Sequence, residues 1–130
     1  MIIVDDRLSL EALGGRIGVA GEVATTWGFH YRLLRALHDE TRLGALSRHV
    51  SPRLRGIVAD PPPDRLVVLD PRLVTRLAAE LTVLHGLNLL AAELFASALH
   101  HRASVLLSAP NVGRTWADVA ATEGIALEIA

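Results

Sequence analysis

The sequence predicts a single α/β domain over residues 1–130, with a central, mostly parallel sheet flanked by helices on both sides. Its 130 residues, 51% of them hydrophobic, suit one domain with a sizeable core. Short apolar runs without alternation are typical of strands buried on both faces of a parallel sheet. In the second half these runs alternate with amphipathic helical segments, as in proteins built around a parallel sheet.

The first half begins with a strand at residues 2–4, Ile-Ile-Val, which places Asp5 at the carboxyl end of that strand. Open α/β folds usually place their sites at this end. Three helices are expected next: one from Leu8 to the Gly14-Gly15 pair, one capped by Thr25 or Thr26 that reaches Leu37, and one from Asp39-Glu40 to about His49.

The second half opens with a loop at three consecutive prolines, residues 61–63, which cannot be helical. Asp70-Pro71 predicts a helix start, with Asp as the cap and Pro at the first helical position. The expected order is a strand at 66–69, a helix from 71 to Gly86, a helix at 88–102, a strand at 105–107, a helix at 113–122 and a strand at 125–129.

Composition narrows the possible classes of function. The formal net charge is −1, which argues against a protein that binds nucleic acid through a broad basic face. The absence of cysteine excludes disulfides, thiolate catalysis and Cys-type zinc sites, and fits a cytoplasmic protein. The longest stretch without a charge, residues 81–92, is shorter than the ~20 apolar residues of a membrane span, and no secretory signal is visible.

Three segments, "MIIVD", "GLNLLAAELFASALHHRASVLLSAP" and "ATEGIALEIA", together resemble a PIN domain, in particular the small VapC-type toxins of bacterial toxin–antitoxin pairs. The resemblance covers the whole chain in segment order and is firmest after residue 66. It implies a ribonuclease that gathers three or four carboxylates around one or two Mg²⁺ or Mn²⁺ ions. It also implies a homodimer and a small antitoxin-like protein partner.

Only one of the four acids that the resemblance implies is present. Asp5 matches the first and is the candidate catalytic and metal-binding residue, whereas the other positions fall at Gly28, at Ala91 and at Ala109 or Pro110. One carboxylate cannot replace several oxygen ligands of Mg²⁺, an ion that loses its water reluctantly. We therefore expect weak or no catalysis.

Two neighbouring acids are secondary candidates. Asp6 should point away from Asp5 if the strand continues, although a turn would bring the two carboxylates together. Glu93 lies two residues beyond Ala91, about 200° away around a helix. It falls on a polar stripe with Ser97, His100 and His101, so we expect it to be solvated.

Three further groups have a structural and a functional interpretation. Trp27 and Tyr31 are expected to pack on the sheet with His30 near the surface; stacking of these aromatics and Phe29 on bases is the alternative. Adjacent His100 and His101 diverge by about 100° on a helix and should not share a metal ion. The arginines around the proline loop are expected to be solvated, with RNA or acidic-partner contact as the alternative: Arg48, Arg53, Arg55 and Arg65.

Two functions therefore compete. The first is a PIN-like protein with weak or no catalysis that acts by binding protein or RNA. The second is an active Mg²⁺- or Mn²⁺-dependent endoribonuclease, the toxin of a toxin–antitoxin pair, which uses Asp5 with Asp6 or Glu93.

Overall fold

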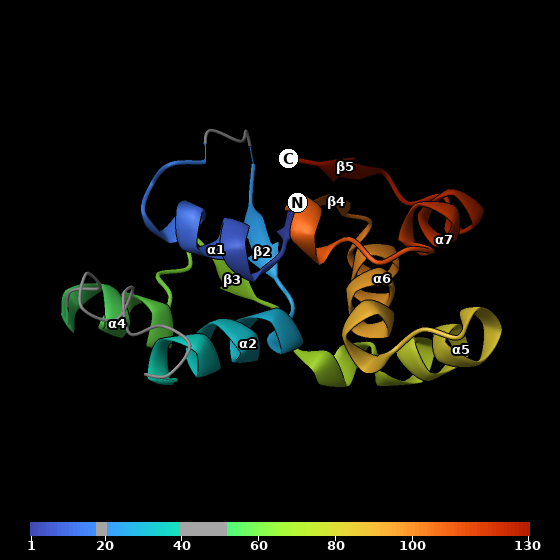
Figure 1. Cartoon of the computed structure of the whole chain (residues 1–130), viewed down its shortest axis with the longest axis horizontal. Coiled ribbons are helices and arrows are strands. Elements are labelled where there is room, and N and C mark those ends of the chain that lie inside the picture. Colours follow the sequence, from blue (N-terminus) through green and yellow to red (C-terminus); the bar gives the residue numbers. More distant parts are fainter. Residues whose placement is uncertain (18–20, 40–51) are drawn as a thin grey trace.

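A computed structural model of the chain describes residues 1–17, 21–39 and 52–130. It contains a five-stranded, all-parallel sheet flanked by helices, which confirms the predicted α/β fold class (Figure 1). The strands are β1 (Ile2–Val4), β2 (Val23–Thr25), β3 (Val67–Val68), β4 (Ser104–Leu107) and β5 (Leu127–Ile129). The helices are α1 (Asp6–Leu13), α2 (Trp27–His38), α4 (Pro52–Ala59), α5 (Thr75–His85), α6 (Leu89–His101) and α7 (Trp116–Glu123), with 3₁₀ turns η1 (Pro71–Leu73) and η2 (Ala109–Asn111).

The strand order β3-β2-β1-β4-β5 places β1 at the centre of the sheet. The chain runs outward from β1 through β2 to β3, and then returns so that β4 pairs with the other side of β1. Between β1 and β4 the direction of winding therefore reverses. In open α/β sheets, ligands bind beyond the carboxyl ends of the strands at such a reversal.

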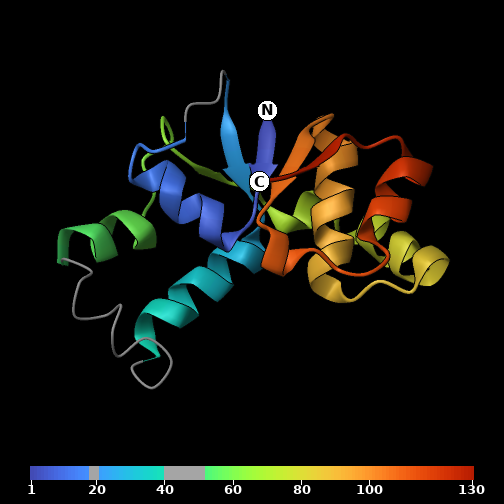
Figure 2. The same ribbon diagram turned by 45° about the horizontal axis from the view of Figure 1, so that its top comes forward.

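Two cores lie on opposite faces of the sheet, because successive side chains of a strand point in opposite directions. Ile3 packs in the larger core, which takes most of its helical residues from α5, α6 and α7. Val4 packs in the smaller core with residues of α1, α2 and α4. Figure 2 shows the two groups of helices on either side of the strands.

Several boundaries differ from the expected ones. The sequence did not predict β2, which pairs through three residues with β1 and through two with β3. It also did not predict α4, which begins at Pro52. Asp70 does cap the following turn, but that turn is the 3₁₀ segment η1, and α5 begins only at Thr75. The helix expected over 39–49 lies outside the described residues from Glu40 onward.

No single helix in the described part of the chain is long and apolar enough to cross a membrane. The consecutive helices α5 and α6 reach the length and apolar composition of a membrane span only when they are taken together, and they are bent by 118° relative to one another.

Candidate functional site

Asp5 lies at the predicted place, directly after β1, and is completely buried. It is also the N-cap of α1, where its Oδ1 accepts a hydrogen bond from the backbone N–H of Leu8 at 3.0 Å. A carboxylate suits this position because the first turn of a helix leaves N–H groups without a partner and carries partial positive charge. The local fold of the chain therefore uses one oxygen of Asp5.

The other oxygen of Asp5 is held by the segment that follows β4. Oδ2 accepts hydrogen bonds from the backbone N–H of Ser108 at 2.7 Å, from the Ser108 hydroxyl, and from Nδ2 of Asn111 at 3.0 Å. With the bond to Leu8 this makes four donors, and a carboxylate has about four lone-pair sites in total. Three donors thus share Oδ2 and one binds Oδ1, so protein donors take up most of the hydrogen-bonding capacity of Asp5.

Asp6 joins the same network because the chain turns into α1 directly after Asp5. Nδ2 of Asn111 donates to Oδ1 of Asp6 at 2.7 Å as well as to Asp5. Arg32 of α2 lies beside the pair: its Nε is 3.4 Å from Oδ2 of Asp6, and its Nη2 donates to Oδ1 of Asn111 at 3.3 Å. The turn that would bring both carboxylates together is therefore present. The amide group of Asn111 contacts both carboxylates, and the guanidinium group of Arg32 lies beside Asp6. We call Asp5, Asp6, Arg32, Ser108 and Asn111 the switch-point network.

None of the positions that the resemblance assigns to the other acids adds a carboxylate here. Gly28 lies in the first turn of α2, Ala91 is completely buried in α6, and Ala109 and Pro110 form an exposed 3₁₀ turn. Sequence reasoning did not identify Ser108, Asn111 or Arg32. The one available indication was that polar residues stand directly on either side of Ala109-Pro110.

The switch-point network does not fit a Mg²⁺ or Mn²⁺ centre of the kind that the resemblance implies. These ions require several oxygen ligands with free lone pairs. The four donors on Asp5 compete for those lone pairs, and Arg32 places positive charge beside Asp6. Within residues 1–17, 21–39 and 52–130, no three His, Cys, Asp or Glu side chains converge in a way that would hold a metal.

Glu93 is not solvated, contrary to the expectation from its polar stripe. Only 7% of it is exposed, and every residue of α6 from Ala91 to Ala98 is buried. The expectation assumed that one side of α6 faces solvent, but α6 packs against α2, α5, α7 and η1. Glu93 also does not join Asp5: its Oε1 accepts a hydrogen bond from the backbone N–H of Gly28 at 2.9 Å.

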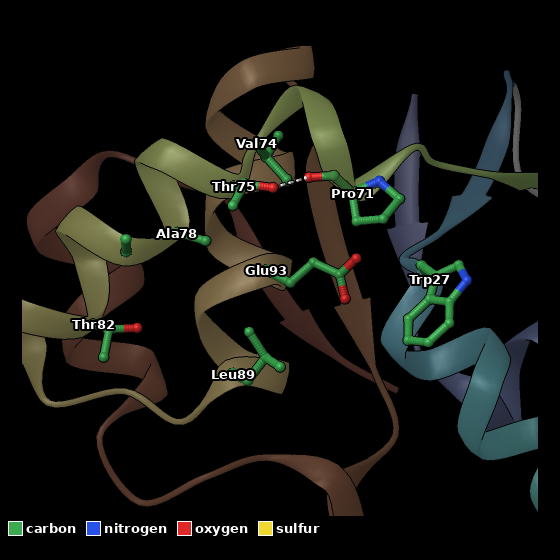
Figure 3. A pocket seen from close by; sticks show the side chains of 9 residues that line it. Trp27, Pro71, Val74, Thr75, Ala78, Thr82, Leu89 and Glu93 are labelled. Carbon is green, nitrogen blue, oxygen red and sulfur yellow. Dashed lines mark hydrogen bonds between the residues drawn. The ribbon is translucent and has the colours of Figure 1, made fainter.

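The second carboxylate oxygen of Glu93, Oε2, is buried and makes no hydrogen bond to the part of the chain that the structure describes. Burial raises the pKa of this carboxyl group, and the backbone N–H groups of Gly28 and Trp27 oppose that rise in part. The side chain extends from α6 into a pocket of about 420 Å³ between η1, α5 and the start of α2 (Figure 3). Its walls are mostly apolar and include Trp27, Val74, Ala78 and Leu89.

The aromatic residues of α2 are arranged differently from the expectation. Trp27 and Tyr31 are 52% and 50% exposed and stack on one another, with ring centroids 5.4 Å apart. Phe29 is buried instead, in line with Leu33 and Leu37 at intervals of four. Phe29 packs in the larger core and Leu33 and Leu37 pack in the smaller one, so the Trp27 side of the helix faces outward.

His30 is buried rather than near the surface, and burial lowers its pKa. His100 and His101 pack edge to face, with ring centroids 4.8 Å apart.

The arginines near the proline loop do not share one loop. Arg53 and Arg55 lie on α4, whereas Arg65 donates from Nη1 to the backbone oxygen of Leu13 at 2.7 Å. Arg48 lies outside the described residues. Two of the described arginines thus lie on α4, and the third binds the backbone at the end of α1.

Comparison with known proteins adds no family to these observations. No protein-family model matches the chain, and no curated protein matches it.

Proposed function

We propose that this chain is a PIN-like domain protein with weak or no catalysis, which acts by binding a protein. The four donors around Asp5 are the observation that carries this proposal. A metal that binds Asp5 must compete with these four bonds, and a second carboxylate paired with arginine adds little affinity. The switch-point network then serves to join β1, α1, α2 and η2.

A protein partner is favoured over RNA by charge and by the exposed side chains. The net charge of −1 provides no broad attraction for phosphates. On α5, by contrast, Val83 and Leu84 are 89% and 70% exposed and line a shallow, mostly apolar hollow with Ala79 and Glu80. We assign this surface to a second copy of the chain, because the resemblance to PIN domains implies a homodimer and a two-fold axis would bring this patch against itself. A small antitoxin-like partner and a cytoplasmic location belong to the same proposal, on the resemblance and on the lack of cysteine.

RNA cleavage tests the proposal. Purified chain is incubated with a mixed-sequence RNA and Mg²⁺ or Mn²⁺, beside Asp5→Asn and, as a matched control at an exposed acid, Asp118→Asn. We expect no cleavage above the level seen with EDTA, and no difference among the three proteins. Robust metal-dependent cleavage that Asp5→Asn abolishes and Asp118→Asn leaves intact would contradict the proposal in favour of an active endoribonuclease.

A further inference from the structure

The Glu93 pocket has the construction of a ligand site that is separate from the switch-point network. Its volume, about 420 Å³, falls in the range of small-molecule sites, which span about 300–1,000 Å³. The lining is mostly apolar, and among the described residues that form it Glu93 is the one ionisable side chain. Sites of this kind usually combine apolar walls with a few polar groups that fix the orientation of the ligand.

Glu93 itself indicates which end of a ligand it would hold. Only 7% of Glu93 is exposed, and the hydrogen bond from the backbone N–H of Gly28 holds Oε1 at the start of α2. Oε2 has no hydrogen-bond partner among residues 1–17, 21–39 and 52–130. Figure 3 shows the carboxyl group extending between Pro71 and Trp27. A buried carboxylate without a partner is costly, so a ligand that donates a hydrogen bond to Oε2 gains binding free energy.

The surroundings favour a cationic donor over the alternatives. A carboxylate repels anions, and the described part of the chain contributes no arginine to the lining. A divalent metal needs several oxygen ligands, whereas the described lining residues supply a single carboxylate. A neutral donor would leave the buried charge uncompensated, while an ammonium group compensates it and forms the stronger, charge-assisted hydrogen bond.

Trp27 adds a large aromatic surface to the wall of the pocket (Figure 3). The Glu93 carboxylate suits an ammonium group, and the walls formed by Trp27, Val74, Ala78 and Leu89 suit an alkyl or aryl body.

We propose that this pocket binds a small protonated amine with an apolar body, whose ammonium group donates to Oε2 of Glu93 and whose body lies against α5 and Trp27. The proposal stands independently of the catalytic state of Asp5, because the two sites share no residue.

Isothermal titration calorimetry with n-octylamine tests it, with 1-octanol and octanoate as ligands of equal chain length. We expect saturable one-site binding of octylamine, with a Kd at or below about 1 mM, and at least tenfold weaker binding of the alcohol and the acid. Failure of octylamine to bind, or equal binding of octanol or octanoate, would overturn the proposal.

Glu93→Gln removes the charge and keeps an oxygen that accepts from Gly28. It should weaken octylamine binding about 10- to 100-fold, whereas Glu80→Gln, at an exposed acid of the neighbouring helix α5, should not change it. Thr82→Phe places bulk in the pocket from an exposed position and should abolish binding without depending on the fold of a Glu93 variant. Unchanged affinity in both Glu93→Gln and Thr82→Phe would place octylamine elsewhere and overturn the proposal.

Discussion

The backbone N–H of Ser108 donates to Oδ2 of Asp5 at 2.7 Å, across a separation of 103 residues. The bond joins the ends of β1 and β4, the two strands between which the sheet reverses its direction of winding. At this place many α/β proteins bind a ligand. Here the protein supplies its own donors to the carboxylate.

Asp5→Asn should destabilise the fold. Asparagine has a single side-chain oxygen, so either Leu8 or the Ser108–Asn111 group would face an amide that donates rather than accepts. Loss of an N-cap and of buried hydrogen bonds predicts a decrease of about 2–4 kcal/mol in the free energy of unfolding. Urea denaturation measures it, with exposed Asp118→Asn as the control that should change stability by less than about 0.5 kcal/mol. A difference that small for Asp5→Asn would mean that the four bonds do not stabilise the fold.

Gly28→Ala should act through Glu93. A Cβ atom at residue 28 would lie 2.7 Å from Oε1 of Glu93 and 3.0 Å from Cδ1 of Leu90. The carboxyl group would have to move and lose its bond to the backbone N–H of residue 28. We expect Gly28→Ala to lower the free energy of unfolding of the wild-type protein by about 1–2 kcal/mol. Once the Glu93 carboxyl group is removed, the higher helix propensity of alanine should instead raise it by about 0.5–1 kcal/mol.

The matched background is Glu93→Ala, in which Gly28→Ala should be neutral or stabilising. Thermal or urea unfolding of the four proteins gives the coupling between the two positions. If Gly28→Ala lowered the free energy of unfolding equally in both backgrounds, the contact with Glu93 would not be the reason why residue 28 is glycine.

The pH dependence of stability should report the burial of Glu93. The pKa of Glu93 is raised in the folded state above the ordinary value of 4.5. At a pH between the unfolded and the folded pKa, the folded state therefore holds more protons than the unfolded state. This stabilisation is complete below the unfolded pKa and is lost as the pH rises through the folded pKa. Glu93→Gln should therefore unfold at a higher urea concentration than wild type at pH 7, and the difference should shrink as the pH falls toward 4. A difference that is constant with pH would contradict the assignment.

The exposed α5 surface predicts a dimer that a charge disrupts. Val83→Asp would place a carboxylate in the apolar contact between two copies and should raise the dimer Kd at least about tenfold. Sedimentation velocity measures the change, with Ala117→Asp on the exposed side of α7 as the control. A wild-type chain that sediments as a monomer at all concentrations would rule out this interface.

Most of the fold was predictable because its strongest elements have local sequence signatures. Ile2, Ile3 and Val4 form an uninterrupted apolar run, and Gly86 ends α5 in the left-handed conformation that glycine adopts readily. The strand β2 was missed because Val23–Thr25 is only three residues long, and its place between β1 and β3 depends on pairing across the sheet.

The candidate site was predictable only in part, for a related reason. Asp5 could be located because it directly follows a recognisable strand. Its partners Ser108 and Asn111 reach it through tertiary structure, and the 3₁₀ turn that aims Asn111 has no distinctive pattern. The burial of Glu93 was missed because periodicity along α6 does not reveal that other elements enclose the helix.

A titration with Mn²⁺, followed by electron paramagnetic resonance of the free ion, tests the central claim that protein donors rather than a metal hold Asp5. We predict that wild type and Asp5→Asn leave the same concentration of free Mn²⁺ at every point, with no saturable site of Kd below about 1 mM, because a single hydrogen-bonded carboxylate is a poor ligand set. Stoichiometric Mn²⁺ binding by wild type that Asp5→Asn removes would contradict the account.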